Sequence, residues 1–256
     1  MACVTALIMT EPVLIEVCVD SVASAVAAER GGAQRIELCS DLLEGGITPS
    51  VGLLGVVRSK VSIPVHVIIR PRGGDFWYSE AEFDSMKRDI EVAKSEGANG
   101  VVLGILEREG TVDVRRTRQL VERARPLSVT FHRAFDMSSD LFRALNDVCA
   151  IGVDRLLTSG GEQECLHGVE TVARLVKDAR GRISIMAGGR IGIDNASTII
   201  ERTGVTEIHV GLATPVKSAM LHQNSRLSLG KVQGREFEQS EVLEENVRRL
   251  RQAVAH

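Results

Sequence analysis

Two short segments of this 256-residue chain repeat the same order of isoleucine, glutamate, cysteine and aspartate. The first, LIEVCVD, covers residues 14–20, and the second, RIELCSD, covers residues 35–41. If both segments are β-strands, side chains alternate between the two faces, so Glu16 shares a face with Cys18, and the second segment repeats this arrangement. Two strands then present a carboxylate and a thiol together, which suits either metal binding or acid–base chemistry.

The first of these chemistries is metal binding through Cys18 and Cys39. Soft thiolates suit Cu(I) or Zn(II), and a site with two sulfurs favours Cu(I), because a structural zinc ion takes four ligands. For neighbouring strands of a barrel, strand spacing and a height offset predict roughly 5–7 Å between the thiols before rotamers adjust. The alternative is that both cysteines only fill the core, as free cysteines commonly do.

The second chemistry is catalysis on a small anionic or phosphorylated metabolite. Glu37, His132 and Arg70 would serve as general base, general acid and electrostatic clamp. Glycines also crowd the segments TSGG at 158–161 and AGGRIG at 187–192, where backbone N–H groups could hold phosphate. Glycine turns are ordinary loop chemistry too, so this interpretation stays open. The candidate anion-binding residues are Gly160, Gly188, Gly189 and Arg190.

Eight short runs rich in β-branched residues alternate with amphipathic segments along the chain, which is typical of βα units. Helix starts are marked by Thr48 before Pro49 and by Ser79 with Glu82 at capping-box spacing. The first run lacks the glycine fingerprint of an open dinucleotide-binding sheet, so we predict a single-domain TIM (β/α)8 barrel. The predicted strands are 14–20, 35–40, 65–71, 100–106, 128–134, 155–159, 183–188 and 207–211.

The rest of the chain is assigned to the same domain. Residues 1–13 are expected to form a tail, residues 214–238 an irregular loop, and residues 239–254 a helix that closes the ring.

TIM-barrel interiors are usually aliphatic, but the predicted inner faces of five strands are polar. Buried carboxylates need partners, and Arg70 and the histidines are the expected ones. One interpretation is a polar plug that satisfies itself, and the other is a functional site at the C-terminal ends of the strands. The polar pairs are Glu16 and Cys18, Glu37 and Cys39, His66 and Arg70, Thr130 and His132, and Glu207 and His209.

Composition limits the partners. A formal net charge of −3 and a pI near 6.1 give no electrostatic reason to expect nucleic acid or an anionic membrane surface. The first basic residue is Arg30, so the N-terminal segment lacks the charged region of a signal peptide, and its apolar run is too short to span a bilayer. An intracellular protein with reduced thiols is the expectation.

The motifs together resemble the CutC copper homeostasis family, in its animal form. The resemblance implies a TIM barrel, a homo-oligomer (dimer or tetramer), a cytoplasmic and also a nuclear location, and Cu(I) binding through Cys18 and Cys39. Ala187 and Arg190 depart from the family pattern, as does IHVGLA at 208–213, which puts a shared anionic ligand in doubt. The matching motifs are IEVCVDS, RIELCS, EGG, TPS, IRPRGGDF, VTFHRAFD and LTSG.

The sequence therefore predicts a cytosolic TIM barrel that binds Cu(I) and contributes to copper homeostasis. A metabolic enzyme is the alternative, and a purely structural barrel is a third.

Overall fold

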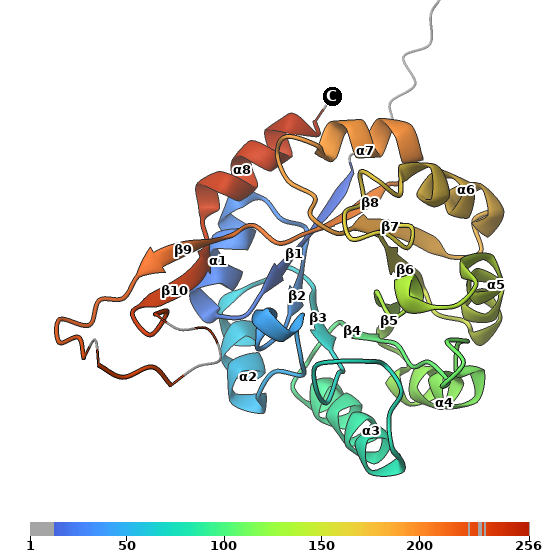
Figure 1. Ribbon diagram of the computed structural model, residues 1–256, viewed down its shortest axis with the longest axis horizontal. Coiled ribbons are helices and arrows are strands. Elements are labelled where there is room, and N and C mark those ends of the chain that lie inside the picture. Colours follow the sequence, from blue (N-terminus) through green and yellow to red (C-terminus); the bar gives the residue numbers. More distant parts are fainter. Residues whose placement is uncertain (1–12, 225, 230–231, 233, 256) are drawn as a thin grey trace, which may run out of the picture.

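The computed structural model describes residues 13–224, 226–229, 232 and 234–255, so most of the predicted N-terminal tail lies outside the described residues. Eight parallel strands form a closed barrel in sequence order, with β8 pairing back onto β1, which confirms the predicted TIM barrel (Figure 1). The strands are β1 (Leu14–Val19), β2 (Arg35–Leu38), β3 (Val65–Ile68), β4 (Gly100–Leu103), β5 (Ser128–Phe131), β6 (Arg155–Thr158), β7 (Ser184–Gly188) and β8 (Glu207–Val210).

An outer ring of helices covers the barrel, and the outward faces of the strands pack against it as the main apolar core. Within the described residues, no helix is both long enough and apolar enough to cross a bilayer. The helices are α1 (Val22–Gly31), α2 (Val51–Lys60), α3 (Glu80–Ser95), α4 (Val114–Ala124), α5 (Leu141–Ile151), α6 (Val169–Ala179), α7 (Ala196–Thr203) and α8 (Glu244–Ala253), with short 3-10 turns η1 (Leu42–Glu44) and η2 (Phe135–Met137).

Of the two predicted helix starts, one is confirmed and one is wrong. Ser79 and Glu82 form the predicted capping box at the start of α3. The N-cap of α2 is Ser50, whose hydroxyl accepts a hydrogen bond from Leu53 N–H. Thr48 lies outside the helix because its hydroxyl accepts the backbone N–H of Arg70 at 2.9 Å.

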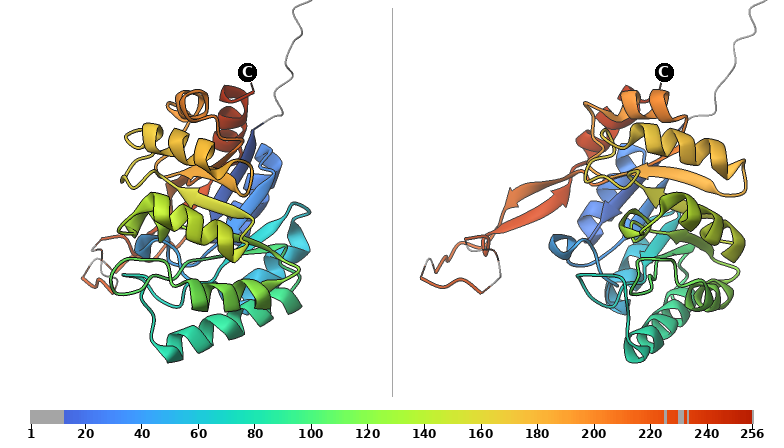
Figure 2. Two further views of the ribbon diagram at one scale, coloured as in Figure 1. Left: turned by 90° about the vertical axis from the view of Figure 1, so that its right-hand side faces the viewer. Right: turned by 45° about the vertical axis from the view of Figure 1, so that its right-hand side comes forward.

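Between β8 and the last helix, the structure differs from the predicted irregular loop. The two ends of this segment pair as an antiparallel ribbon of β9 (Ala213–Lys217) and β10 (Glu238–Val242), which projects away from the barrel (Figures 1 and 2). The closing helix α8 therefore starts later than predicted. It packs against α1 so closely that a Cβ on Gly31 would lie 2.5 Å from Val247 Cβ, so glycine permits this contact.

Candidate metal centre

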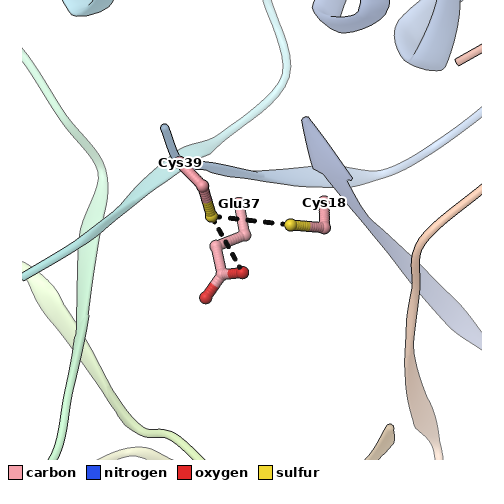
Figure 3. Close-up of side chains that lie close together, drawn as sticks. All are labelled: Cys18, Glu37 and Cys39. Carbon is pink, nitrogen blue, oxygen red and sulfur yellow. Dashed lines mark hydrogen bonds between the residues drawn. The ribbon is translucent and has the colours of Figure 1, made fainter. Parts of the chain in front are cut away.

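Two cysteine side chains meet inside the barrel near the C-terminal ends of β1 and β2. Cys18 Sγ lies 3.5 Å from Cys39 Sγ, and Cys39 Sγ lies 3.4 Å from Glu37 Oε2 (Figure 3). The thiols are closer than the predicted 5–7 Å because both side chains turn toward each other. All three ligand atoms lie within 4.8 Å of one another, in a buried group that could hold a metal ion.

The three groups tune one another electrostatically. The hydrogen bond with Cys39 lowers the pKa of the Cys18 thiol to about 6, against the opposing effect of burial. The same contact raises the pKa of Cys39, with burial acting in the same direction. Burial and the charge of Cys18 raise the pKa of Glu37 to about 8. At neutral pH the cluster therefore favours a thiolate on Cys18 and a protonated thiol on Cys39, beside the neutral carboxyl group of Glu37.

A fully buried carboxylate, Glu16, lies one inward-facing position before Cys18 on β1. Burial alone would raise the pKa of Glu16, but the hydrogen bond with His209 and the charge of Arg35 hold it below its ordinary value. His209 Nδ1 lies 2.8 Å from Glu16 Oε1, and Arg35 Nε donates to Glu16 Oε2. Glu16 is therefore an ionised, fully paired group in the barrel interior.

Two arginines that sequence reasoning did not place in the barrel complete this network. Arg35 also donates to Glu207 Oε2 at 2.6 Å, and Arg155 pairs with the same carboxylate. Ser184 Oγ donates to Glu207 Oε1 at 2.6 Å. Arg35 has the same strand parity as Glu37, so strand alternation could have placed it in the barrel interior.

The expected pairing of Arg70 with the buried carboxylates is wrong. The Arg70 guanidinium instead donates to three backbone carbonyl groups, at 2.7 Å to Glu44, 2.9 Å to Gly46 and 2.8 Å to Gly74. These bonds hold together the loops that follow β2 and β3. Within the part of the chain that the structure describes, Arg70 Nε has no hydrogen-bond partner.

His132, the predicted general acid, is buried at the end of β5. Its Nδ1 accepts the N–H of Ala134 at 3.1 Å, which places the proton of the neutral ring on Nε2. Burial, together with the charge of Arg70, lowers the pKa of His132 to about 3. Its ring centroid lies 5.1 Å from that of Phe76, whose ring is also 5.1 Å from the Arg70 guanidinium carbon. At neutral pH, His132 is a hydrogen-bond donor and not a cationic acid.

The predicted anion-binding residues lie in the loops after β6 and β7, where their contacts are internal. Gly160 N–H donates to Thr158 Oγ1 at 2.9 Å, and the carbonyl of Gly189 accepts Cys165 N–H at 2.9 Å. A Cβ on Gly188 would lie 2.5 Å from Leu157 Cδ1, so glycine is needed there for packing.

The remaining candidate, Arg190, is exposed and pairs with Glu164 at 2.7 Å. The backbone N–H groups of Ser159 and Gly161, the kind of donors that a phosphate would use, donate to the Asp136 carboxylate at 3.1 Å. The anion site at these residues stays a prediction, and this internal carboxylate gives it no support.

Comparison with known proteins identifies the family. A CutC family model matches residues 13–214, which covers all eight barrel strands. This chain belongs to the CutC family. The matched region contains the thiol cluster and its buried carboxylate neighbour, whereas most of the β9–β10 ribbon and α8 lie beyond it.

Relatives in animals and bacteria support the assignment. The chain is 51% identical over 217 residues to the copper homeostasis protein cutC homologs of Mus musculus and Homo sapiens, which covers 85% of this chain and 80% of each relative. The solved structure of CutC from Streptococcus agalactiae superposes with a TM-score of 0.73 at 33% identity, over 77% of this chain and 97% of that one.

The buried network predicts a stability difference between two ion pairs. Replacing Arg35 with methionine leaves Glu16 and Glu207 short of a buried cation, so the free energy of unfolding should fall by about 3–5 kcal/mol. Replacing Arg202, whose partner Glu170 is on the surface, should cost less than about 1 kcal/mol. Urea unfolding followed by circular dichroism measures both, and equal effects would contradict a supporting role for the inner network.

Proposed function

We propose that this CutC-family chain binds Cu(I) through Cys18 and Cys39 and takes part in copper homeostasis in the cytosol. The observation that carries the proposal is the 3.5 Å approach of two thiols from neighbouring segments inside the barrel. Two thiolates supply the soft ligands that Cu(I) prefers. The relatives that are named copper homeostasis proteins support the same metal.

The protonation state of the cluster also fits a monovalent soft ion. One thiolate is favoured before binding, and a metal that takes both sulfurs would displace the proton of Cys39. Glu37, which lies beside Cys39 and is neutral before binding because of its raised pKa, would release its own proton to serve as an oxygen ligand. Cu(I) binding should therefore release protons and weaken as the pH falls.

A reducing compartment agrees with this chemistry because the thiols must remain unpaired. The cysteines among the described residues are free, in agreement with the proposed cytoplasmic, and also nuclear, location. The slightly acidic composition supports neither nucleic acid nor an anionic membrane as a partner.

Anaerobic titration of the reduced protein with Cu(I), against a competing chelator, tests the proposal. We expect one tight site per chain, because the two sulfurs form a single cluster. Cys18→Ser and Cys39→Ser should each weaken binding by at least about 100-fold, since a hydroxyl is a poor ligand for a soft metal.

Cys165→Ser is the matched control for that titration. Cys165 is equally buried, but its surroundings include Asp136 and Arg133 and not the thiol pair, so its replacement should leave the affinity unchanged. The proposal would be contradicted if the wild-type protein bound Cu(I) weakly and the affinity did not change in Cys18→Ser and Cys39→Ser.

A second candidate function, binding or conversion of a small anionic metabolite, is favoured by two unpartnered donors. Among the described residues, Arg70 Nε and His132 Nε2 are buried without a hydrogen-bond partner, and both side chains pack near Phe76. The Tyr78 hydroxyl, which lies near Arg70, is also buried and makes no hydrogen bond within the part of the chain that the structure describes. Buried donors without partners are rare, and an anionic oxygen would satisfy them. Glu37 would then be the acid or base, in keeping with its raised pKa.

Calorimetry with inorganic phosphate tests this second candidate and separates the two anion sites. If the donors beside Phe76 form the site, His132→Phe should weaken phosphate binding at least about tenfold by removing one donor. Arg190→Gln should then have no effect, because Arg190 lies in the glycine-rich loops after β6 and β7, where it pairs with Glu164. If phosphate binding weakens with Arg190→Gln alone, the anion binds at the glycine-rich loops after β6 and β7. If the wild-type protein does not bind phosphate, neither anion site is supported.

We also propose that the chain self-associates, as a dimer or tetramer, through the β9–β10 arm. Large apolar side chains are exposed on the loop of this arm, including Leu221 at 100% and Leu229 at 82%. An isolated two-stranded ribbon is marginally stable in water, and exposed apolar groups of this kind mark interaction surfaces.

Sedimentation velocity tests the role of the arm. The wild-type chain should sediment as an oligomer, and replacing both Leu221 and Leu229 with serine should shift it toward the monomer by removing apolar contacts. Met137→Ser, at a residue 67% exposed in the turn η2, serves as the control. A wild-type monomer, or an oligomer insensitive to the double replacement, would refute the proposal.

A further inference from the structure

A histidine, His209, lies at the edge of the proposed Cu(I) site in addition to the two thiols. Resting on that proposed function, we propose that His209 is a third metal ligand through Nε2, and that Glu16 is the positioning residue that orients it. The site would then contain two sulfurs and one imidazole nitrogen, with Glu37 beside them.

The barrel seam between β1 and β8 places this histidine. Glu16 and His209 are paired in register across the two strands, and the Nδ1 atom of His209 lies 2.8 Å from Glu16 Oε1. Because the ionised carboxylate can only accept, Nδ1 carries the hydrogen and donates it. The atom left for coordination is Nε2, which would release its own hydrogen to solvent as the metal binds.

The Nε2 atom faces the thiol cluster. It lies 3.7 Å from Glu37 Oε2, the same oxygen that is 3.4 Å from Cys39 Sγ. His209 is also among the groups that lower the pKa of the Cys18 thiol. Nε2 therefore borders the carboxylate oxygen that contacts the Cys39 sulfur.

The surroundings hold the ring in this orientation. Arg35 fixes the other oxygen of Glu16, so the carboxylate cannot turn away from the imidazole without breaking an ion pair. Gly188 on β7 lies beside the ring, where a Cβ would come 3.3 Å from His209 Cβ. A metal-binding histidine whose second nitrogen donates to a carboxylate is a recurrent arrangement in metalloproteins, and the carboxylate fixes both tautomer and orientation.

His66 provides an internal comparison. Its Nδ1 lies 3.9 Å from Glu16 Oε2, so it approaches the same carboxylate, but that nitrogen has no hydrogen-bond partner among the described residues. Its ring packs on Gly100, where a Cβ would come 2.6 Å from the ring. Two histidines thus share one carboxylate, and only His209 is hydrogen-bonded to it and borders the cluster.

Competitive Cu(I) titration of matched variants tests the inference. His209→Gln should lower the affinity at least about tenfold, and Glu16→Gln, which loses the charge behind the ring, should lower it by about 10- to 100-fold. His66→Gln should change it by less than about threefold.

Nitrogen NMR of the wild-type protein supplies a direct readout that does not depend on how well a variant folds. Cu(I) has a filled d shell and leaves imidazole resonances observable. The Nε2 resonance of His209 should shift in proportion to added Cu(I) up to one equivalent, while those of His66 and His132 stay in place.

The outcomes separate this inference from the proposed function. If Cys18→Ser and Cys39→Ser abolish binding while His209→Gln changes it by less than about threefold and its resonance does not move, the third ligand is refuted and the thiol site stands. If the wild-type chain does not bind Cu(I), the proposed function itself is refuted.

Discussion

The burial of the Glu16 carboxylate in the barrel interior is the constraint on which the rest of the inner structure depends. An unpaired buried charge costs several kcal/mol, so the fold must supply cations at this depth. Arg35 supplies one from β2 and extends to Glu207 on β8, while His209 approaches from the opposite side of Glu16. The seam where β8 closes onto β1 is therefore fastened by side-chain ion pairs as well as by the strand ladder.

The same pairing sets the conditions at the thiol cluster. Cys18 follows Glu16 on the inner face of β1, so the sulfurs lie next to a dry, charged layer and not in the aliphatic interior usual for this fold. His209 joins the two layers because one nitrogen contacts Glu16 and the other lies near Glu37. In the absence of metal, the charge of that imidazole favours the thiolate form of Cys18, while the contact with Cys18 and burial keep the Cys39 thiol neutral.

Much of this arrangement could be predicted because strand alternation is a strong constraint. Eight strand-like apolar runs predicted the barrel. The alternation of side chains along each strand predicted that Glu16, Cys18 and His209 lie on inner faces. Strand alternation does not predict which cations pair with the buried carboxylates. Arg70 was therefore predicted to pair with them, although its guanidinium donates to loop carbonyl groups. Loop contacts between distant segments have no local signal, which is why the Asp136 carboxylate among the backbone N–H groups after β6 was not foreseen.

Predictions at the C-terminal end of the chain failed for a related reason. Residues 238–241 are polar and lack the pattern of a buried strand, and pairing with β9 gives them strand geometry. The apolar positions of the last helix were more informative, since Val247 and Leu250 are fully buried in α8. A helix that is buried against the barrel has apolar residues at regular spacing, which can be recognised in the sequence. A ribbon that projects from the barrel has little such apolar periodicity.

X-ray absorption at the copper edge, on the reduced chain loaded with one equivalent of Cu(I), tests the central claim most directly. The account predicts two sulfur scatterers per copper ion in the wild-type protein and one in Cys18→Ser. Copper surrounded by nitrogen and oxygen alone in the wild-type protein would show that the paired thiols are not its ligands, and would contradict the account.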